Sequence, residues 1–304
     1  MQQKSKMNKI FFKSLICLGF AATMGLQTVS AYAGFEAGVE DAGFEKVSLR
    51  SDIEAPAKKM GLNYDVYAGG FKALAATLEM DLDPKAYDMS LKARTQGTIG
   101  SLFPWEATYA TSGHAQNDGT PVPSLHTARS SWKKDEKVTE MQYSPKGTLL
   151  KTTTHEDNKT KVKKDFDPAL TENAVDMLTG ALQMLKNSDQ TEKCEGTFPV
   201  FDGKRRFNIT LQDGGVDKLE KNKYSAFKGD ALRCTLKVEP VAGFKQKDKE
   251  RGWMAVQAHT EARKKPPTLW LAKVAENGPM VPVRMEIASA YGSVVAHLST
   301  LDNK

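Results

Sequence analysis

The chain has 304 residues, 43 basic and 37 acidic side chains, and a sequence pI near 9.0. Residues 1–33 hold four of the lysines and no acid, so the remaining 271 residues carry 39 basic and 37 acidic groups. A nearly neutral chain lacks the basic footprint that binding to phosphates requires, which excludes nucleic acid as an expected partner. The length suits one large β-domain, and no Gly/Ser/Pro-rich linker divides it.

The first 33 residues have the pattern of an export signal. A cationic start is followed by an apolar run from Leu15 to Met24 and by the small-x-small sequence Ala31-Tyr32-Ala33. The run is shorter than the roughly 20 apolar residues that span a bilayer. Cys17 lies inside this run, behind the bulky Leu15 and Ile16, and is not the cysteine of a lipoprotein signal. We therefore expect residues 1–33 to be a signal peptide cleaved after Ala33, and the mature protein to be periplasmic without an integral membrane span.

Two cysteines, Cys194 and Cys234, remain after cleavage. An even pair in an oxidising compartment predicts a disulfide. It would close a loop of about 41 residues and restrict the unfolded chain by roughly 4 kcal/mol in the entropy model. Two free thiols are the alternative, and a redox-catalytic role is disfavoured because neither cysteine belongs to a CxxC motif.

The domain pattern begins after residue 60. Residues 34–60 are expected to form a flexible leader, and 61–304 a single antiparallel β-domain. Short stretches with strand-like alternation and tight turns follow one another, which is typical of an antiparallel meander. The predicted strands before the only long helical pattern are Tyr64–Tyr67, Phe71–Leu82, Tyr87–Arg94, Ser101–Thr111, Leu125–Trp132, Lys137–Tyr143 and Thr148–Thr154. Those after it are Thr197–Phe201, Arg205–Leu211, Asp230–Val238, Trp253–Thr260, Thr268–Val274, Val281–Ala288 and Ser293–Leu301.

One segment has a helical period instead. Between residues 168 and 186 apolar side chains recur at three- and four-residue intervals, as in Leu178, Leu182 and Leu185. Asp167 and Pro168 suit the cap and the first position of a helix. Met177 and Met184 lie beside this stripe, where thioethers suit an adaptable apolar surface, although a stripe of this kind is most often core.

So many strands cannot form a flat open sheet, because twisted sheets of more than about 10 strands curl, close or split. The predicted fold class is therefore mainly β, a large curled antiparallel sheet (half-barrel or spiral) with one substantial covering α-helix. A groove between the sheet and this helix is the expected binding site.

Several short motifs are distributed over the predicted domain. They are Tyr67-x-Gly69-Gly70, Val200-Phe201-Asp202-Gly203-Lys204-Arg205-Arg206, Leu269-Trp270-Leu271, Pro282-Val283-Arg284, Tyr291-Gly292 and Ala296-x-Leu298. Together they resemble an uncharacterised family of exported proteobacterial proteins, the domain of unknown function DUF3108. The resemblance extends from about Leu62 to Leu301 and implies a periplasmic, mainly antiparallel β-fold without an established catalytic set. The layout is also similar to lipoprotein-carrier proteins and to periplasmic envelope-integrity proteins with a spiral sheet, a likeness of fold alone.

Catalytic and cofactor signatures are missing from the sequence. It contains no GxSxG, HExxH, phosphate-binding loop or dinucleotide fingerprint, and no histidine pair has the i, i+4 spacing of a helical metal site. We expect no catalytic residue, metal or cofactor, and we expect surface or strand positions for the histidines: His114, His126, His155, His259 and His297.

The functional hypothesis is a non-enzymatic periplasmic protein that binds an apolar small molecule, a lipid or a segment of a partner protein and supports cell-envelope integrity. Arginines on predicted strands could bind an anionic headgroup through paired N–H donors, although outward, solvated guanidinium groups are the simpler interpretation. The alternative is an envelope hydrolase with an unrecognised acid/base pair. The candidate ligand-binding residues are Met177, Leu178, Met184, Arg206, Trp270 and Arg284.

Overall fold

The computed structural model describes residues 58–303 except 134, 250–251, 276–277 and 290–291. The expected signal peptide and residues 34–57 of the expected leader lie outside the described residues. The prediction that the leader extends to residue 60 was wrong at its end, because the first strand begins at Lys58 and Met60 is buried in the core.

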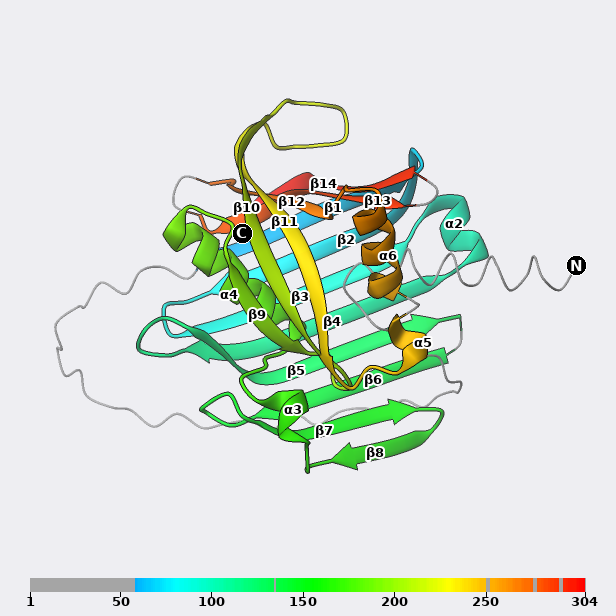
Figure 1. Cartoon of the computed structure of the whole chain (residues 1–304), viewed down its shortest axis with the longest axis vertical. Coiled ribbons are helices and arrows are strands. Elements are labelled where there is room, and N and C mark those ends of the chain that lie inside the picture. Colours follow the sequence, from blue (N-terminus) through cyan, green and yellow to red (C-terminus); the bar gives the residue numbers. More distant parts are fainter. Residues whose placement is uncertain (1–57, 134, 250–251, 276–277, 290–291, 304) are drawn as a thin grey trace, which may run out of the picture.

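The described strands form one antiparallel 14-stranded sheet that does not close into a barrel, as expected from the sequence (Figure 1). Every strand pairs with its neighbour in the sequence except β8 and β9, which form the two edges of the sheet, and the pairing of β1 with β14 joins the two halves of the chain. The first half consists of β1 (Lys58–Ala68), β2 (Phe71–Leu82), β3 (Ala86–Thr95), β4 (Trp105–Ala115), β5 (Pro121–Trp132), β6 (Asp135–Tyr143), β7 (Leu149–Glu156) and β8 (Lys159–Lys163). The second half consists of β9 (Gly196–Phe201), β10 (Arg206–Leu219), β11 (Gly229–Ala242), β12 (Thr268–Lys273), β13 (Met280–Ser289) and β14. The last of these, β14, comprises Gly292–Asn303.

The sheet rolls so that β9, β10 and β11 cross in front of β3 and β4 (Figure 1). Helix α4 (Met177–Thr191) contacts β9 and β13 on one side and β4 and β5 on the other, so it lies inside the roll. The apolar faces of the strands and of α4 form three buried clusters, of which the largest joins β1–β4 to α4 and β12–β14. The predicted covering helix is therefore confirmed as a core element.

The helical segments differ from the prediction in two places. The helix predicted over 168–186 is interrupted: α3 (Pro168–Thr171) ends early, Asn173 has a φ of 54°, and Asp176 caps a separate α4. The predicted strand Trp253–Thr260 was wrong, because these residues belong to α6 (Gly252–Ala262), which contacts β11 and β13. The remaining helices are α2 (Gly97–Leu102), which replaces the start of the predicted strand Ser101–Thr111, and α5 (Gln246–Lys249).

None of the described helices is long and apolar enough to cross a membrane.

Candidate functional site

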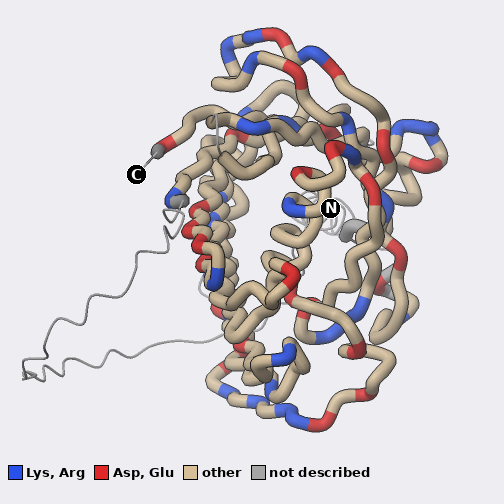
Figure 2. Tube along the Cα trace, turned by 90° about the vertical axis from the view of Figure 1, so that its left-hand side faces the viewer, with Lys and Arg blue, Asp and Glu red and all other residues tan. Residues whose placement is uncertain are grey.

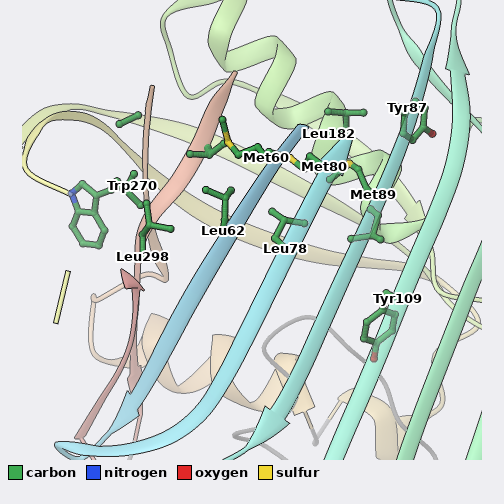
Figure 3. Close-up of a cluster of buried hydrophobic side chains, with 14 of the residues drawn as sticks. Met60, Leu62, Leu78, Met80, Tyr87, Met89, Tyr109, Leu182, Trp270 and Leu298 are labelled. Atoms are coloured by element: carbon green, nitrogen blue, oxygen red, sulfur yellow. The ribbon is translucent and has the colours of Figure 1, made fainter. Parts of the chain in front are cut away.

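The interior of the roll is rich in methionine. All nine methionines of the described residues lie in the three buried clusters or pack against them. Met60, Met80 and Met89 lie side by side on β1, β2 and β3, facing the helix that carries Leu182 (Figure 3). Thioether side chains are flexible and polarisable, so this interior can adapt to apolar groups of different shape. The other six are Met141, Met177, Met184, Met254, Met280 and Met285.

The helix closes this interior with its apolar stripe. Leu178, Leu182 and Leu185 are 4%, 3% and 7% exposed, so the predicted site residue Leu178 is a core residue. Met177 and Met184 are partly buried and pack against the cluster that contains Leu185. The helix therefore fills the apolar space between β9 and β13 on one side and β4 and β5 on the other.

Hydrogen bonds hold α4 to the β4–β5 region. Lys186 Nζ donates to the carbonyl oxygen of Gly119 at 2.6 Å, and Gln183 Nε2 donates to that of Pro121 at 2.9 Å. These two bonds lie on the partly buried side of the helix, close to the β4–β5 turn.

A buried polar group holds the start of α4 more firmly. Oδ1 of Asp176 accepts from the backbone N–H groups of Leu178 and Thr179 at 3.0 and 3.1 Å, and Oδ2 accepts from the Thr179 hydroxyl at 2.6 Å. The same carboxylate lies 3.0 Å from Nδ1 of His126 on β5 and accepts from Thr111 on β4 at 2.8 Å. Asp176 thereby ties the helix N-terminus to two strands.

Electrostatics favour the charged form of this carboxylate. Burial is the largest influence on Asp176 and by itself would raise its pKa, but the charge and hydrogen bond of His126 and the donors from Thr179 outweigh it. The pKa of Asp176 is therefore lowered. Nearby, burial raises the pKa of Tyr87, which keeps this phenol protonated and hydrogen-bonded to the Thr179 hydroxyl at 2.7 Å.

Sequence reasoning missed this group. His126 was expected at the surface or on a strand without a special role, yet its side chain is 3% exposed beside a fully buried acid. The helix-capping pattern, Asp176 followed by the apolar run Leu178–Leu185, was the available signal for the acid. No local signal joins Asp176 to His126, because the two residues are 50 positions apart.

Two predicted site residues, Trp270 and Arg284, meet across β12 and β13. They are register partners, and the guanidinium carbon lies 4.8 Å from the centre of the indole ring. The indole N–H donates to Asp217 at 2.9 Å, and Arg284 pairs with Glu286 at 2.7 Å. This cation–π pair therefore already has polar partners within the protein.

Arg206, the remaining candidate ligand-binding residue, lies at the start of β10, where it donates to the carbonyl oxygen of Ala169 on α3 at 3.3 Å. Its Nε is buried and has no hydrogen-bond partner among the described residues.

A groove of about 390 Å³ lies on the opposite, solvent-facing side of β1–β5. Met60, Met80, Met89 and Thr111 are paired with one another across β1–β4, and their backbone forms the floor of the groove. The residues before and after each of them in its strand form the walls. The walls carry Lys59, Asp81 and Asp88 at one end and Ala110, Leu125 and Thr127 at the other. The Lys59–Asp81 ion pair of 2.9 Å lies in this wall.

The predicted disulfide is present. Cys194 and Cys234 are both fully buried, with Cα atoms 5.2 Å apart and a sequence separation of 40. The bond joins the segment after α4 to β11, so it fixes the C-terminal side of the helix to the sheet.

Among the residues that the structure describes, no group of three His, Cys, Asp or Glu side chains is arranged to hold a metal ion.

These features define a rolled, open antiparallel sheet with a helix enclosed against a methionine-lined interior. The chain belongs to the DUF3108 family of proteins of unknown function, whose family model matches residues 63–299. No curated protein matches the chain. Among solved structures, a β-barrel-like protein of the domain of unknown function DUF1849 from Brucella abortus is similar at 13% identity and a TM-score of 0.45. That match covers 81% of this chain and 98% of the other, and at this TM-score it carries no argument about function.

Proposed function

We propose that the chain is an exported, non-catalytic protein of the cell envelope that binds an apolar ligand, such as a lipid chain or an apolar segment of a partner, between α4 and the sheet. The observation that carries this proposal is the concentration of methionine around α4. Met60, Met80 and Met89 share a buried cluster with Leu178 and Leu182 of the helix. Met280 shares a second cluster with Leu185, and Met177, Met184, Met254 and Met285 pack against it. An enclosed, adaptable apolar surface suits ligands that lack a fixed shape. The buried disulfide supports export, because such bonds persist in oxidising compartments.

In this proposal α4 is the element that moves. Its apolar stripe occupies the place that the ligand takes, so the ligand exchanges one set of apolar contacts for another. The bonds of Gln183 and Lys186 to the β4–β5 turn and the contacts of Asp176 with β4 and β5 favour the closed position, and the disulfide keeps the segment after α4 on β11 while the helix moves. When only a fraction of the molecules is open, the apparent affinity equals the affinity of the open form multiplied by that fraction.

The test is titration of the mature protein with an apolar fluorescent probe and with a fluorescent lipid analogue. We expect saturable fluorescence enhancement, weakened by Met177→Gln and Met184→Gln with little change in the melting temperature. The double variant Gln183→Ala/Lys186→Ala should bind the probe more tightly, because the closed state loses two hydrogen bonds. Gln190→Ala, at an exposed position of the same helix, is the control and should bind like the wild type.

The competing hypothesis is an envelope hydrolase, and the His126–Asp176 pair is the acid/base pair that it would use. Every contact of Asp176 described above also serves to hold α4, which favours a structural role. Turnover in a broad hydrolase screen that His126→Asn abolishes, in a protein that shows no probe binding, would replace the binding proposal with the enzyme.

A further inference from the structure

Large apolar side chains are exposed at one end of the sheet. Phe71, the first residue of β2, is 75% exposed, and Leu102, the last residue of α2, is 64% exposed. Tyr224, in the connection between β10 and β11, is 38% exposed. We name these three residues the tip surface.

Several contacts bring these three residues to the same end. Phe71 pairs with Ala68 across the β1–β2 turn, and helix α2 contacts the same end of β2, where Gln96 N–H donates to the Ala73 carbonyl at 3.0 Å. Tyr224 is held over β1 and β14, since its ring lies 4.8 Å from that of Tyr67 and stacks 5.9 Å from His297. The β1–β2 turn and the β10–β11 connection both lie in the upper part of Figure 1.

The connection that carries Tyr224 is basic. Residues 220–228 contain three lysines and one acid, Glu220, and Lys223 lies over the Tyr224 ring at 4.9 Å. Figure 2 shows both basic and acidic residues along the loop at the top of the molecule. The backbone of this segment is anchored to the sheet, because Ala226 N–H donates to the carbonyl oxygen of Leu298 at 2.8 Å. The three lysines are Lys221, Lys223 and Lys228.

We propose that the tip surface docks on an anionic lipid bilayer. Exposed aromatic and aliphatic side chains insert at the level of the lipid headgroups, where a phenol and an aromatic ring are both favoured. The adjacent lysines match the negative charge of such a surface, which attracts basic side chains that lie close to it. The roll would then approach the membrane with one end of the sheet, and the interior described above is not needed for this contact.

The test is sedimentation with vesicles of phosphatidylcholine alone and of phosphatidylcholine with about a third of phosphatidylglycerol. The tip variant is Phe71→Ser/Lys221→Gln/Lys223→Gln. The matched control is Leu150→Ser/Lys159→Gln/Lys161→Gln, which removes one exposed apolar side chain and two exposed lysines from β7 and β8. We expect the wild type and the control to bind anionic vesicles equally, and the tip variant to bind at least tenfold more weakly. All three should unfold at similar temperatures.

A second readout reports where the contact is made. Phe71→Trp should give a blue-shifted emission when anionic vesicles are added, whereas Leu150→Trp should not. The proposal is overturned if the wild type does not bind anionic vesicles or if the control variant loses as much binding as the tip variant. It is also overturned if Phe71→Trp shows no shift in emission although the protein binds the vesicles. The titration with the apolar fluorescent probe, which tests the proposed function, is independent of these outcomes, because the tip variant leaves the methionine-lined interior unchanged.

Discussion

At the scale of single residues, Asp176 connects local and distant structure. Its carboxylate accepts hydrogen bonds from the first turn of α4 and also binds side chains of β4 and β5. A buried acid in this position is stable because each oxygen has donors, and replacing one oxygen by the NH₂ group of asparagine leaves the donors of that oxygen without an acceptor.

We expect Asp176→Asn to lower the free energy of unfolding at pH 7 by roughly 1–3 kcal/mol. The pKa of Asp176 is lowered in the folded state, so its charged form stabilises the fold above the ordinary pKa of about 3.8, and this contribution is lost as the pH falls through the folded pKa. The difference in unfolding free energy between wild type and Asp176→Asn should therefore narrow as the pH falls below about 3.8.

Urea unfolding at several pH values measures this. Asp118→Asn is the control: Asp118 also caps a backbone N–H, of Thr120 at 2.8 Å, but lies in the exposed β4–β5 turn. Its effect should be small. An Asp176→Asn penalty that is the same at pH 7 and pH 2.5 would show that the charge is not what stabilises the helix start.

At the scale of elements, α4 is the helix around which the sheet rolls. The sequence pattern predicts its apolar stripe well, because Leu178, Leu182 and Leu185 repeat at helical intervals and the helix is long enough for the period to be visible. The pattern does not show the break at residues 172–176, which depends on Asn173 with its positive φ and on the cap at Asp176.

Leu178→Asp should destabilise the fold by several kcal/mol, because it places an unpaired charge in the core at a position that is 4% exposed. Thermal unfolding followed by circular dichroism measures the change. Gln190→Asp puts the same charge on an exposed turn of α4 and should leave the melting temperature nearly unchanged. Equal melting temperatures for Leu178→Asp and wild type would contradict the enclosed position of the helix.

The strand predicted over Trp253–Thr260 shows the limit of the same reasoning. Its apolar residues are compatible with a short buried strand or a short helix, and local periodicity cannot separate the two at this length. The chain forms α6 there because β11 and β12 already pair with each other, so the connection between them covers the sheet instead of extending it.

At the scale of the whole molecule, two non-local links hold the roll together. One is the pairing of β1 with β14, which joins the ends of the described chain, and the other is the disulfide between the segment after α4 and β11. Both restrict the chain over long sequence separations, where an unfolded polypeptide has much conformational freedom to lose.

Cys234→Ser should lower the free energy of unfolding by about 2–5 kcal/mol, the usual cost of removing a native disulfide. Guanidinium unfolding with and without dithiothreitol measures it. The reductant should shift the midpoint of the wild type and leave that of Cys234→Ser unchanged. A reductant-insensitive wild type, or free alkylation of both thiols in periplasmic material, would show that the cysteines are not linked in the cell.

The amino-acid sequence by itself determined the mainly β class, most strand positions, the apolar stripe of α4 and the cysteine pairing, because each of these depends on periodicity, turn residues or residue count. Only the tertiary structure decided which residues share a site. It places Leu178 in the core, joins Trp270 to Arg284, and brings His126 to Asp176 and Tyr224 to Tyr67. The physical reason is that alternation shows that a strand has two faces but not which distant segment covers each face. In this chain that choice is made by the β1–β14 pairing and by the enclosure of α4.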